Sequence, residues 1–231
     1  MPSLSIFREI AMQHTVRVWD LPTRLFHWAL VLSIVALIVT AKVGGNAMTW
    51  HVRLGCAVLA LLAFRLVWGL VGGRWSRFWS FIYSPARTLR YLRGNEAPED
   101  EVGHSPMGAL SVFGLLTLLT LQDISGLMSD DEIATAGPLT RFVSGDTVGR
   151  ATWYHANVGQ YLLIALIVLH LLAILFYVLV RKRTLVRPMV LGDKQLEHPA
   201  TPARDDALTR TLALIVLAFC AALAWWVDSL G

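Results

Sequence analysis

The sequence predicts an all-α membrane protein with five transmembrane helices. Hydrophobic residues make up 55% of the 231 residues, charged residues only 16%, and the mean hydropathy is +0.56. A soluble domain carries about 25% charged residues. Five apolar runs are each long enough to cross a bilayer as a helix, and polar segments separate them.

The first two runs follow a polar arm, residues 1–21. Pro22 suits the first turn of a helix, because its missing N–H is not needed there. The first run extends to about residue 43, and residues 44–46 (Gly-Gly-Asn) are a turn signal. The second run covers about residues 50–73.

Three more runs follow a polar connection, residues 73–106, whose aromatic residues and arginines predict a short helix on the membrane surface. The third run covers about residues 107–128, and an acidic loop extends over residues 129–152. The fourth run, residues 154–182, ends in basic residues, and the fifth covers about residues 208–227.

Positive charge predicts the orientation. Fifteen of the 20 lysines and arginines, Arg8 among them, lie in the arm and in the connections between the second and third runs and between the fourth and fifth. Only four lie on the other side of the membrane. Because basic residues concentrate on the cytoplasmic side, the N-terminus is expected in the cytoplasm and the C-terminus in the periplasm. The net charge of +4 comes mostly from these flanking arginines and does not indicate nucleic-acid binding.

Four histidines lie in the apolar runs, where ionisable residues are costly and often functional. His155 and His170 are 15 residues apart in the fourth run, which gives about 22 Å of axial rise and an offset of about 60°. His27 begins the first run and His51 the second. By depth, His27 pairs with His170 and His51 with His155.

Two imidazoles at one depth are the ligand set of a six-coordinate b-type haem. A hydrogen bond to a neighbouring helix is the alternative for any single histidine. A different metal suits the pairs less well, because no carboxylate or thiolate joins either of them. Cys56 and Cys220 lie in apolar runs outside any Cys-x-x-Cys-His motif, which argues against c-type haem and against a disulfide.

The chain resembles the bacterial cytochrome b561 family, dihaem membrane proteins related to the b-type subunit of nickel–iron hydrogenases. The resemblance covers about residues 16–192 and is carried by six stretches: Trp19–Trp28 (WDLPTRLFHW), Trp50–Gly55 (WHVRLG), Arg65–Gly72 (RLVWGLVG), Gly103–Gly108 (GHSPMG), His155–His170 and Leu185–Gly192 (LVRPMVLG).

The resemblance implies a four-helix transmembrane bundle, residues 22–192, that holds two b-type haems in the bacterial inner membrane. It assigns the axial ligands to His27, His51, His155 and His170. Residues 193–231 are then a linker and a fifth transmembrane helix outside this core.

Other polar residues have weaker assignments. Arginines can bind haem propionates, but they also set orientation and reach lipid headgroups. His104 fits a structural turn or a quinone or proton site, and Asp123 fits a polar contact or a proton acceptor near a quinone. The four arginines predicted as propionate partners are Arg17, Arg24, Arg53 and Arg65.

The predicted function is electron transfer through two haems between a periplasmic redox partner, a c-type cytochrome or an oxidoreductase, and membrane quinone. One alternative is a superoxide:quinone oxidoreductase, although superoxide favours a positive outer surface and the outer loop is acidic. Others are a membrane anchor subunit of a hydrogenase-like complex and a haem-free transporter or scaffold. Whether the chain is itself an enzyme stays open, as does its oligomeric state.

Overall fold

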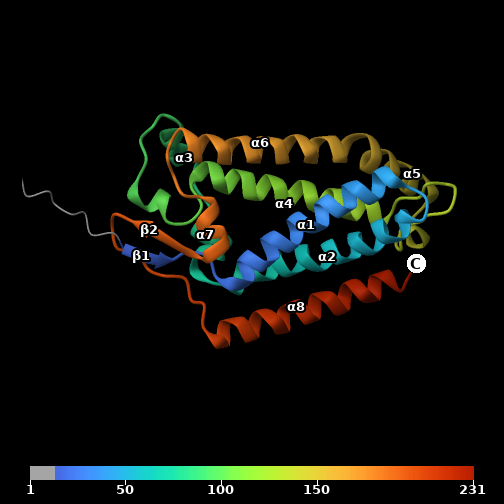
Figure 1. Ribbon diagram of the computed structural model, residues 1–231. Helices are drawn as coiled ribbons and strands as arrows, with labels where there is room; N and C mark the ends of the chain where they lie inside the picture. Colours follow the sequence, from blue (N-terminus) through green and yellow to red (C-terminus); the bar gives the residue numbers. More distant parts are fainter. Residues whose placement is uncertain (1–13) are drawn as a thin grey trace, which may run out of the picture.

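Five long helices form the body of the protein (Figure 1). The computed structural model describes residues 14–231, so residues 1–13 of the predicted arm, Arg8 included, lie outside the described residues. Each long helix is apolar and long enough to span a bilayer, which confirms the multi-pass membrane prediction. They are α1 (Leu21–Val43), α2 (Ala47–Val71), α4 (Pro106–Leu127), a continuous helix made of α5 (Gly145–Tyr154), a π-helical turn (His155–Gly159) and α6 (Gln160–Leu179), and α8 (Ala207–Asp228).

Shorter elements gather at one end of the bundle. Strands β1 (His14–Arg17) and β2 (Asp193–Leu196) pair antiparallel, with His14 opposite Leu196 and Arg17 opposite Asp193. Helices α3 (Pro85–Leu92) and α7 (Val186–Leu191) lie beside them (Figure 1). We call this end, where α1 and α8 begin, the sheet end, and the opposite end, which holds the connection between α4 and α5, the loop end.

Side-chain caps explain where the long helices begin. The carboxylate of Asp20 accepts a hydrogen bond from the Thr23 N–H (2.8 Å) at the start of α1, and Pro22 follows in the first turn. The Asp206 carboxylate accepts one from the Thr209 N–H (2.8 Å) at the start of α8. α1 ends at Gly44, whose φ of 68° suits glycine.

The fourth span differs most from the sequence prediction. It begins at Gly145 rather than at Tyr154, so part of the predicted loop 129–152 is helical. The Ser144 hydroxyl caps α5, whose polar residues give no hydropathy signal. The π-helical turn also changes the angle between His155 and His170 from the value for a regular α-helix. The surface helix expected in residues 73–106 is α3.

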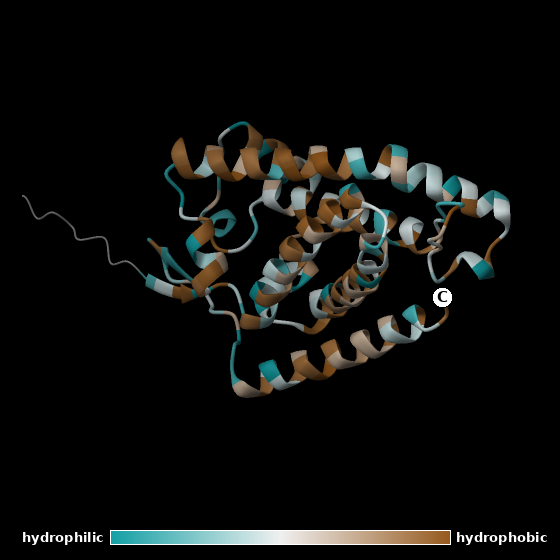
Figure 2. Cartoon of the chain, turned by 45° about the vertical axis from the view of Figure 1, so that its right-hand side comes forward, coloured by the Kyte–Doolittle hydropathy of each residue, from teal (hydrophilic) through white to brown (hydrophobic). Residues whose placement is uncertain are grey.

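Helix α2 lies at the centre of the packing. It contacts α1, α4 and α8, α6 packs on α4, and α8 also touches α1. The long helices are hydrophobic along most of their length and hydrophilic near their ends (Figure 2). The core joins all five of them, through buried residues such as Phe26 of α1, Trp68 of α2, Leu119 of α4, Leu163 of α6 and Cys220 of α8.

Candidate metal centres

Two of the predicted histidines face each other at the loop end. His51 lies in the first turns of α2, and His155 begins the π-helical turn. Their ring centroids are 6.1 Å apart, and the ring planes are nearly perpendicular, at 88°. Metal–nitrogen bonds are about 2 Å long. One metal atom therefore fits between the two rings, with an imidazole on either side.

The other two histidines lie toward the sheet end. His27 is in the second turn of α1 and His170 in the second half of α6, and their rings are near enough to interact electrostatically. All four rings are half-buried. The structure thus brings His51 and His155 together and places His27 and His170 toward the same end.

Three of the four histidine rings make a polar contact through their Nδ1 atom. The Nδ1–H groups of His51 and His155 donate to the carbonyl oxygens of Leu37 (3.0 Å) and Gln122 (2.9 Å). Nδ1 of His170 is 3.0 Å from the Ser111 hydroxyl. A carbonyl can only accept, so at His51 and His155 the proton is on Nδ1 and the lone pair is on Nε2. These contacts orient Nε2 as the ligand nitrogen. Nδ1 of His27 is buried without a partner in residues 14–231.

Gln122 contacts His155 through both its side chain and its main chain. Its side-chain amide donates to the His155 carbonyl oxygen (3.0 Å), while its own carbonyl accepts from the His155 ring. A Cβ on Gly126 would lie 2.6 Å from Cε1 of His155, and one on Gly159 would overlap the Gln122 side chain. Glycine at both positions therefore makes room for the contact. Gln122 could not be predicted from the sequence, because an amide near the end of an apolar helix is common.

A cavity of about 400 Å³ surrounds the loop-end pair. Side chains of α1, α2, α4 and α6 form it, with His51 and His155 in the wall together with apolar residues such as Leu37, Leu119 and Leu163. A b-type haem takes two axial ligands from protein and buries an apolar macrocycle. The facing imidazoles, their Nδ1 anchors and the apolar walls fit that group.

Asp123 and His104, the two residues with alternative structural or quinone and proton roles, also have defined positions. Asp123 of α4 lines the same cavity, is 8% exposed, and has one carboxylate oxygen without a hydrogen-bond partner in residues 14–231. The His104 ring packs between Trp19 and Phe81, with centroid distances of 4.6 and 4.4 Å, and burial lowers the pKa of His104 to about 3. A neutral ring between two aromatic rings fits the structural assignment of His104.

Asp20 organises the sheet end, a role that was not predicted from the sequence. Its carboxylate is fully buried and accepts hydrogen bonds from the Thr23 and Gly73 N–H groups, the Ser76 hydroxyl and the Trp68 indole, at 2.8 to 3.3 Å. Four donors compensate the buried charge. The signal was an aspartate directly before Leu-Pro, which is typical of a helix N-cap.

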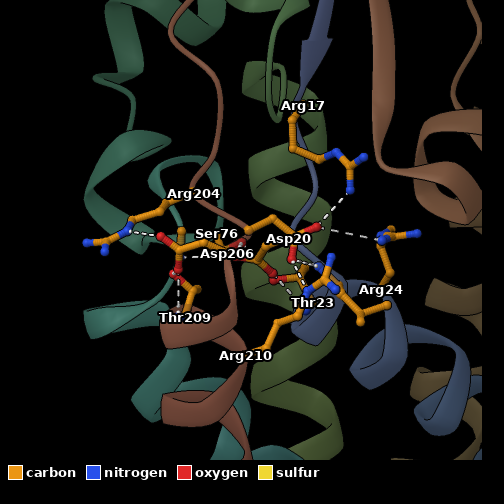
Figure 3. Close-up of polar contacts among 12 residues, drawn as sticks. Arg17, Asp20, Thr23, Arg24, Ser76, Arg204, Asp206, Thr209 and Arg210 are labelled. Atoms are coloured by element: carbon orange, nitrogen blue, oxygen red, sulfur yellow. Dashed lines mark hydrogen bonds and ion pairs between the residues drawn. The ribbon is translucent and has the colours of Figure 1, made fainter.

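The predicted propionate partners fall into two groups. Arg17 forms ion pairs with Asp193 (2.6 Å) and Asp205 (2.7 Å). Arg24 donates to the Val190 carbonyl (2.6 Å) and lies 3.9 Å from Asp205 (Figure 3). These contacts tie the start of the chain's first span to the segment before α8.

Arg53 and Arg65 have aromatic neighbours instead. The Arg53 guanidinium lies over the Trp50 ring at 5.4 Å. Buried Arg65 lies over Phe78 at 4.7 Å and donates to the Ser76 carbonyl (3.0 Å). Neither forms an ion pair with a carboxylate of the described chain, so both keep donors available for another anion.

Comparisons with known proteins agree with this arrangement. The family model of prokaryotic cytochrome b561 matches residues 18–192. A probable Ni/Fe-hydrogenase B-type cytochrome subunit of Rhodobacter capsulatus is 23% identical over 222 residues, which cover 80% of this chain and 83% of that protein. The probable Ni/Fe-hydrogenase 1 B-type cytochrome subunit of Escherichia coli (strain K12) is 24% identical over 212 residues, covering 76% and 88%.

No solved structure matches the chain significantly. The family model, in contrast, spans all four histidines, which lie in α1, α2, the π-helical turn and α6, and it spans α4 as well. On this match, the chain belongs to the prokaryotic cytochrome b561 family.

Proposed function

We propose that the protein carries electrons across the bacterial inner membrane through two b-type haems, between a periplasmic redox partner and the quinone pool. The family implies haem b and membrane electron transfer. The observation that carries the proposal is the facing pair His51 and His155 in an apolar cavity, with a second histidine pair toward the sheet end. When bound, haem iron supplies one-electron redox chemistry.

The four histidines act as axial ligands in this proposal. His51 and His155 hold the haem at the loop end, and His27 and His170 hold the other. The Nδ1 hydrogen bonds of His51, His155 and His170 keep each ring oriented and its Nε2 free to bind iron. His155 and His170 are 15 residues apart on one helix, about 22 Å at about 1.5 Å per residue.

Arginines and apolar walls complete each site. Of the four predicted propionate partners, Arg53 and Arg65 are better available than Arg17 and Arg24, because no carboxylate of the described chain pairs with them. Apolar side chains from α1, α2, α4 and α6 form much of the wall of the loop-end cavity. A low local dielectric strengthens the remaining electrostatic contacts.

The proposed orientation places the sheet end in the cytoplasm. It rests on the excess of lysine and arginine in the segments at that end, since basic residues concentrate on the cytoplasmic side. The loop end, with His51 and His155, then faces the periplasm, and the electron donor or acceptor there would be a protein in that compartment.

A hydrogenase-like oxidoreductase is a second candidate partner. Two relatives are named as probable B-type cytochrome subunits of Ni/Fe-hydrogenases. In that case the same four-helix core serves as the membrane subunit of a complex, and the partner delivers electrons to the loop-end haem.

The acidic segment of the loop end suits a basic partner such as a small c-type cytochrome. The Asp131 carboxylate accepts hydrogen bonds from three successive backbone N–H groups, of Ile133, Ala134 and Thr135, which lower its pKa to about 2. It therefore stays ionised at any physiological pH. Asp130 and Asp131 also line the rim of the cavity that holds His155.

A spectrum of the purified protein tests this function. We expect a b-type absorption spectrum, two haems per chain, and two redox transitions in a potentiometric titration. Reduction by a quinol should be reversible by an oxidised acceptor at the periplasmic face. A preparation that folds and inserts normally but binds one haem or none contradicts the proposal.

A further inference from the structure

A basic pocket of about 490 Å³ lies at the sheet end, away from the four histidines. Two segments distant in sequence form it: residues 74–80, directly after α2, and residues 201–204, directly before α8. Its wall includes three arginines and two tryptophans: Arg74, Arg77, Arg204, Trp75 and Trp79.

The arginines of this pocket keep most of their donors free. Arg74 lies over the Trp75 ring at 5.5 Å and Arg77 over the Trp79 ring at 5.7 Å. Arg77 uses one donor, Nε, on the Gly72 carbonyl (2.9 Å). In the part of the chain that the structure describes, neither Arg74 nor Arg77 forms an ion pair. Aromatic rings thus hold these guanidiniums without neutralising them.

Arg204 is the one pocket arginine with an acidic partner. Its Nε lies 2.7 Å from Asp206 (Figure 3). Three guanidiniums and this one carboxylate leave a net charge of +2 (3 − 1) at the pocket. Arginine forks bind phosphate through paired hydrogen bonds, so a phosphate-bearing anion is the ligand class that this pocket suits.

The pocket lies where two long apolar helices end, which is the level expected for lipid headgroups. α2 ends at Val71, three residues before Arg74, and α8 begins at Ala207, three residues after Arg204. Trp79 is 55% exposed, and tryptophans concentrate at membrane–water interfaces. The Trp75 indole donates to the Thr201 carbonyl (2.9 Å) and links the two walls.

We propose that this pocket binds the headgroup of an anionic phospholipid, and that a lipid with two phosphates, of the cardiolipin type, matches its charge best. Basic pockets between transmembrane helices are suited to such headgroups. The bound lipid would bridge the end of α2 and the start of α8 and so stabilise the position of the fifth helix. The inference depends neither on haem nor on the proposed direction of electron transfer.

Native mass spectrometry and thermal unfolding of the detergent-purified full chain test the site. The probes are cardiolipin, phosphatidylglycerol, phosphatidylcholine and inorganic phosphate. We expect cardiolipin to remain bound most strongly and to raise the unfolding temperature. In the variant Arg74→Gln/Arg77→Gln, cardiolipin affinity should fall by about tenfold or more, because two charge-assisted contacts to phosphate are lost.

The control variant is Arg90→Gln/Arg93→Gln. It removes the same charge from the same connection at exposed positions outside the pocket, and it should keep cardiolipin affinity within about twofold of the wild type. Equal losses in the two variants would reduce the site to general surface attraction and overturn the proposal. Equal binding of phosphatidylcholine, or displacement of lipid by inorganic phosphate, would overturn it as well.

Discussion

The protein fixes its histidine rings with its own backbone and side chains. Leu37, Gln122 and Ser111 each contact an Nδ1 atom, and the glycine at position 126 leaves the space that the His155 ring needs. Contacts of this kind set both the direction and the basicity of a ligand nitrogen. The residues beside the histidines should therefore affect the proposed haem sites nearly as strongly as the histidines themselves.

The first prediction concerns ligation. Replacing His51 or His155 by alanine should remove one haem, and replacing His27 or His170 should remove the other, because each haem loses an axial ligand. Haem content per chain should fall by about half in each variant. Redox titration identifies which component is lost. If His27→Ala and His51→Ala abolished the same component, the pairing would be wrong.

The second prediction concerns Gly126→Ala. A Cβ at this position would lie 2.6 Å from the His155 ring, so the ring must move. We expect the loop-end haem to be lost or its potential shifted, while the other haem stays unchanged. Gly149→Ala, on the neighbouring helix α5, is the control, because a Cβ there meets nothing within 4 Å. Two unaltered redox transitions in Gly126→Ala would contradict the proposed ligand role of His155.

At the level of elements, hydropathy predicts the long helices. It does not predict the π-helical turn or the two strands, which depend on local polar contacts. Trp68 and Phe26 lie in apolar runs that are long enough to predict bilayer-spanning helices. The π-helical turn at His155 was not predictable, because it accompanies a contact from Gln122 on another helix. The strands at His14 and Asp193 are short and polar, with no alternating pattern to indicate them.

The third prediction concerns Asp20, whose hydrogen bonds connect the start of α1 to the end of α2 and the residues after it. Asp20→Asn keeps the size of the side chain. It replaces one acceptor oxygen by an NH₂ group, which then faces N–H or O–H groups that need an acceptor. We expect a loss of about 3 kcal/mol in stability, typical of a broken buried charge network. Thermal unfolding in detergent measures it. Glu197→Gln removes the same charge from an exposed position and should leave the unfolding temperature nearly unchanged.

For the whole molecule, the five spans and the charge distribution define two chemically different ends. The sheet end carries the ion pairs of Arg17 with Asp193 and Asp205, and the basic pocket between α2 and α8. The loop end carries the cavity and the acidic residues Asp130 and Asp131. Apolar runs in the sequence predict the number of spans and depth predicts how the histidines pair, but the contacts that hold each ring required the structure.

The fourth prediction concerns topology. A reporter that is active only outside the cytoplasm should work when fused after Gly231. Inserted after Gly94, in the turn that follows α3, it should be inactive, because this segment lies at the basic sheet end. A cytoplasmic reporter should give the opposite results. If the same reporter were active at both positions, the two positions would lie on the same side of the membrane, and the proposed topology would be wrong.

The fifth prediction concerns the partner at the loop end. Asp130→Asn/Glu132→Gln removes two charges but spares Asp131, whose carboxylate orders the turn. Electron exchange with a basic c-type cytochrome should slow at low salt and converge with the wild type near 1 M salt, where screening shortens to about 3 Å. Stopped-flow mixing measures the rates.

Glu99→Gln/Glu197→Gln, at the sheet end, is the matched control and should not alter the exchange rate. If the loop-end variant exchanged electrons as fast as the wild type at low salt, the acidic segment would have no role in docking. The partner would then use an apolar face.

The pairing of β1 with β2 has a consequence for biosynthesis. Arg17 and Asp193 are 176 residues apart, and Asp205, the second partner of Arg17, is even later in the chain. During translation, β1 must therefore wait unpaired until four spans have entered the membrane and residues 193–196 have left the ribosome. Closing so long a loop costs entropy and is slow compared with local helix formation. The sheet can therefore close only after all four helices of the core have been synthesised.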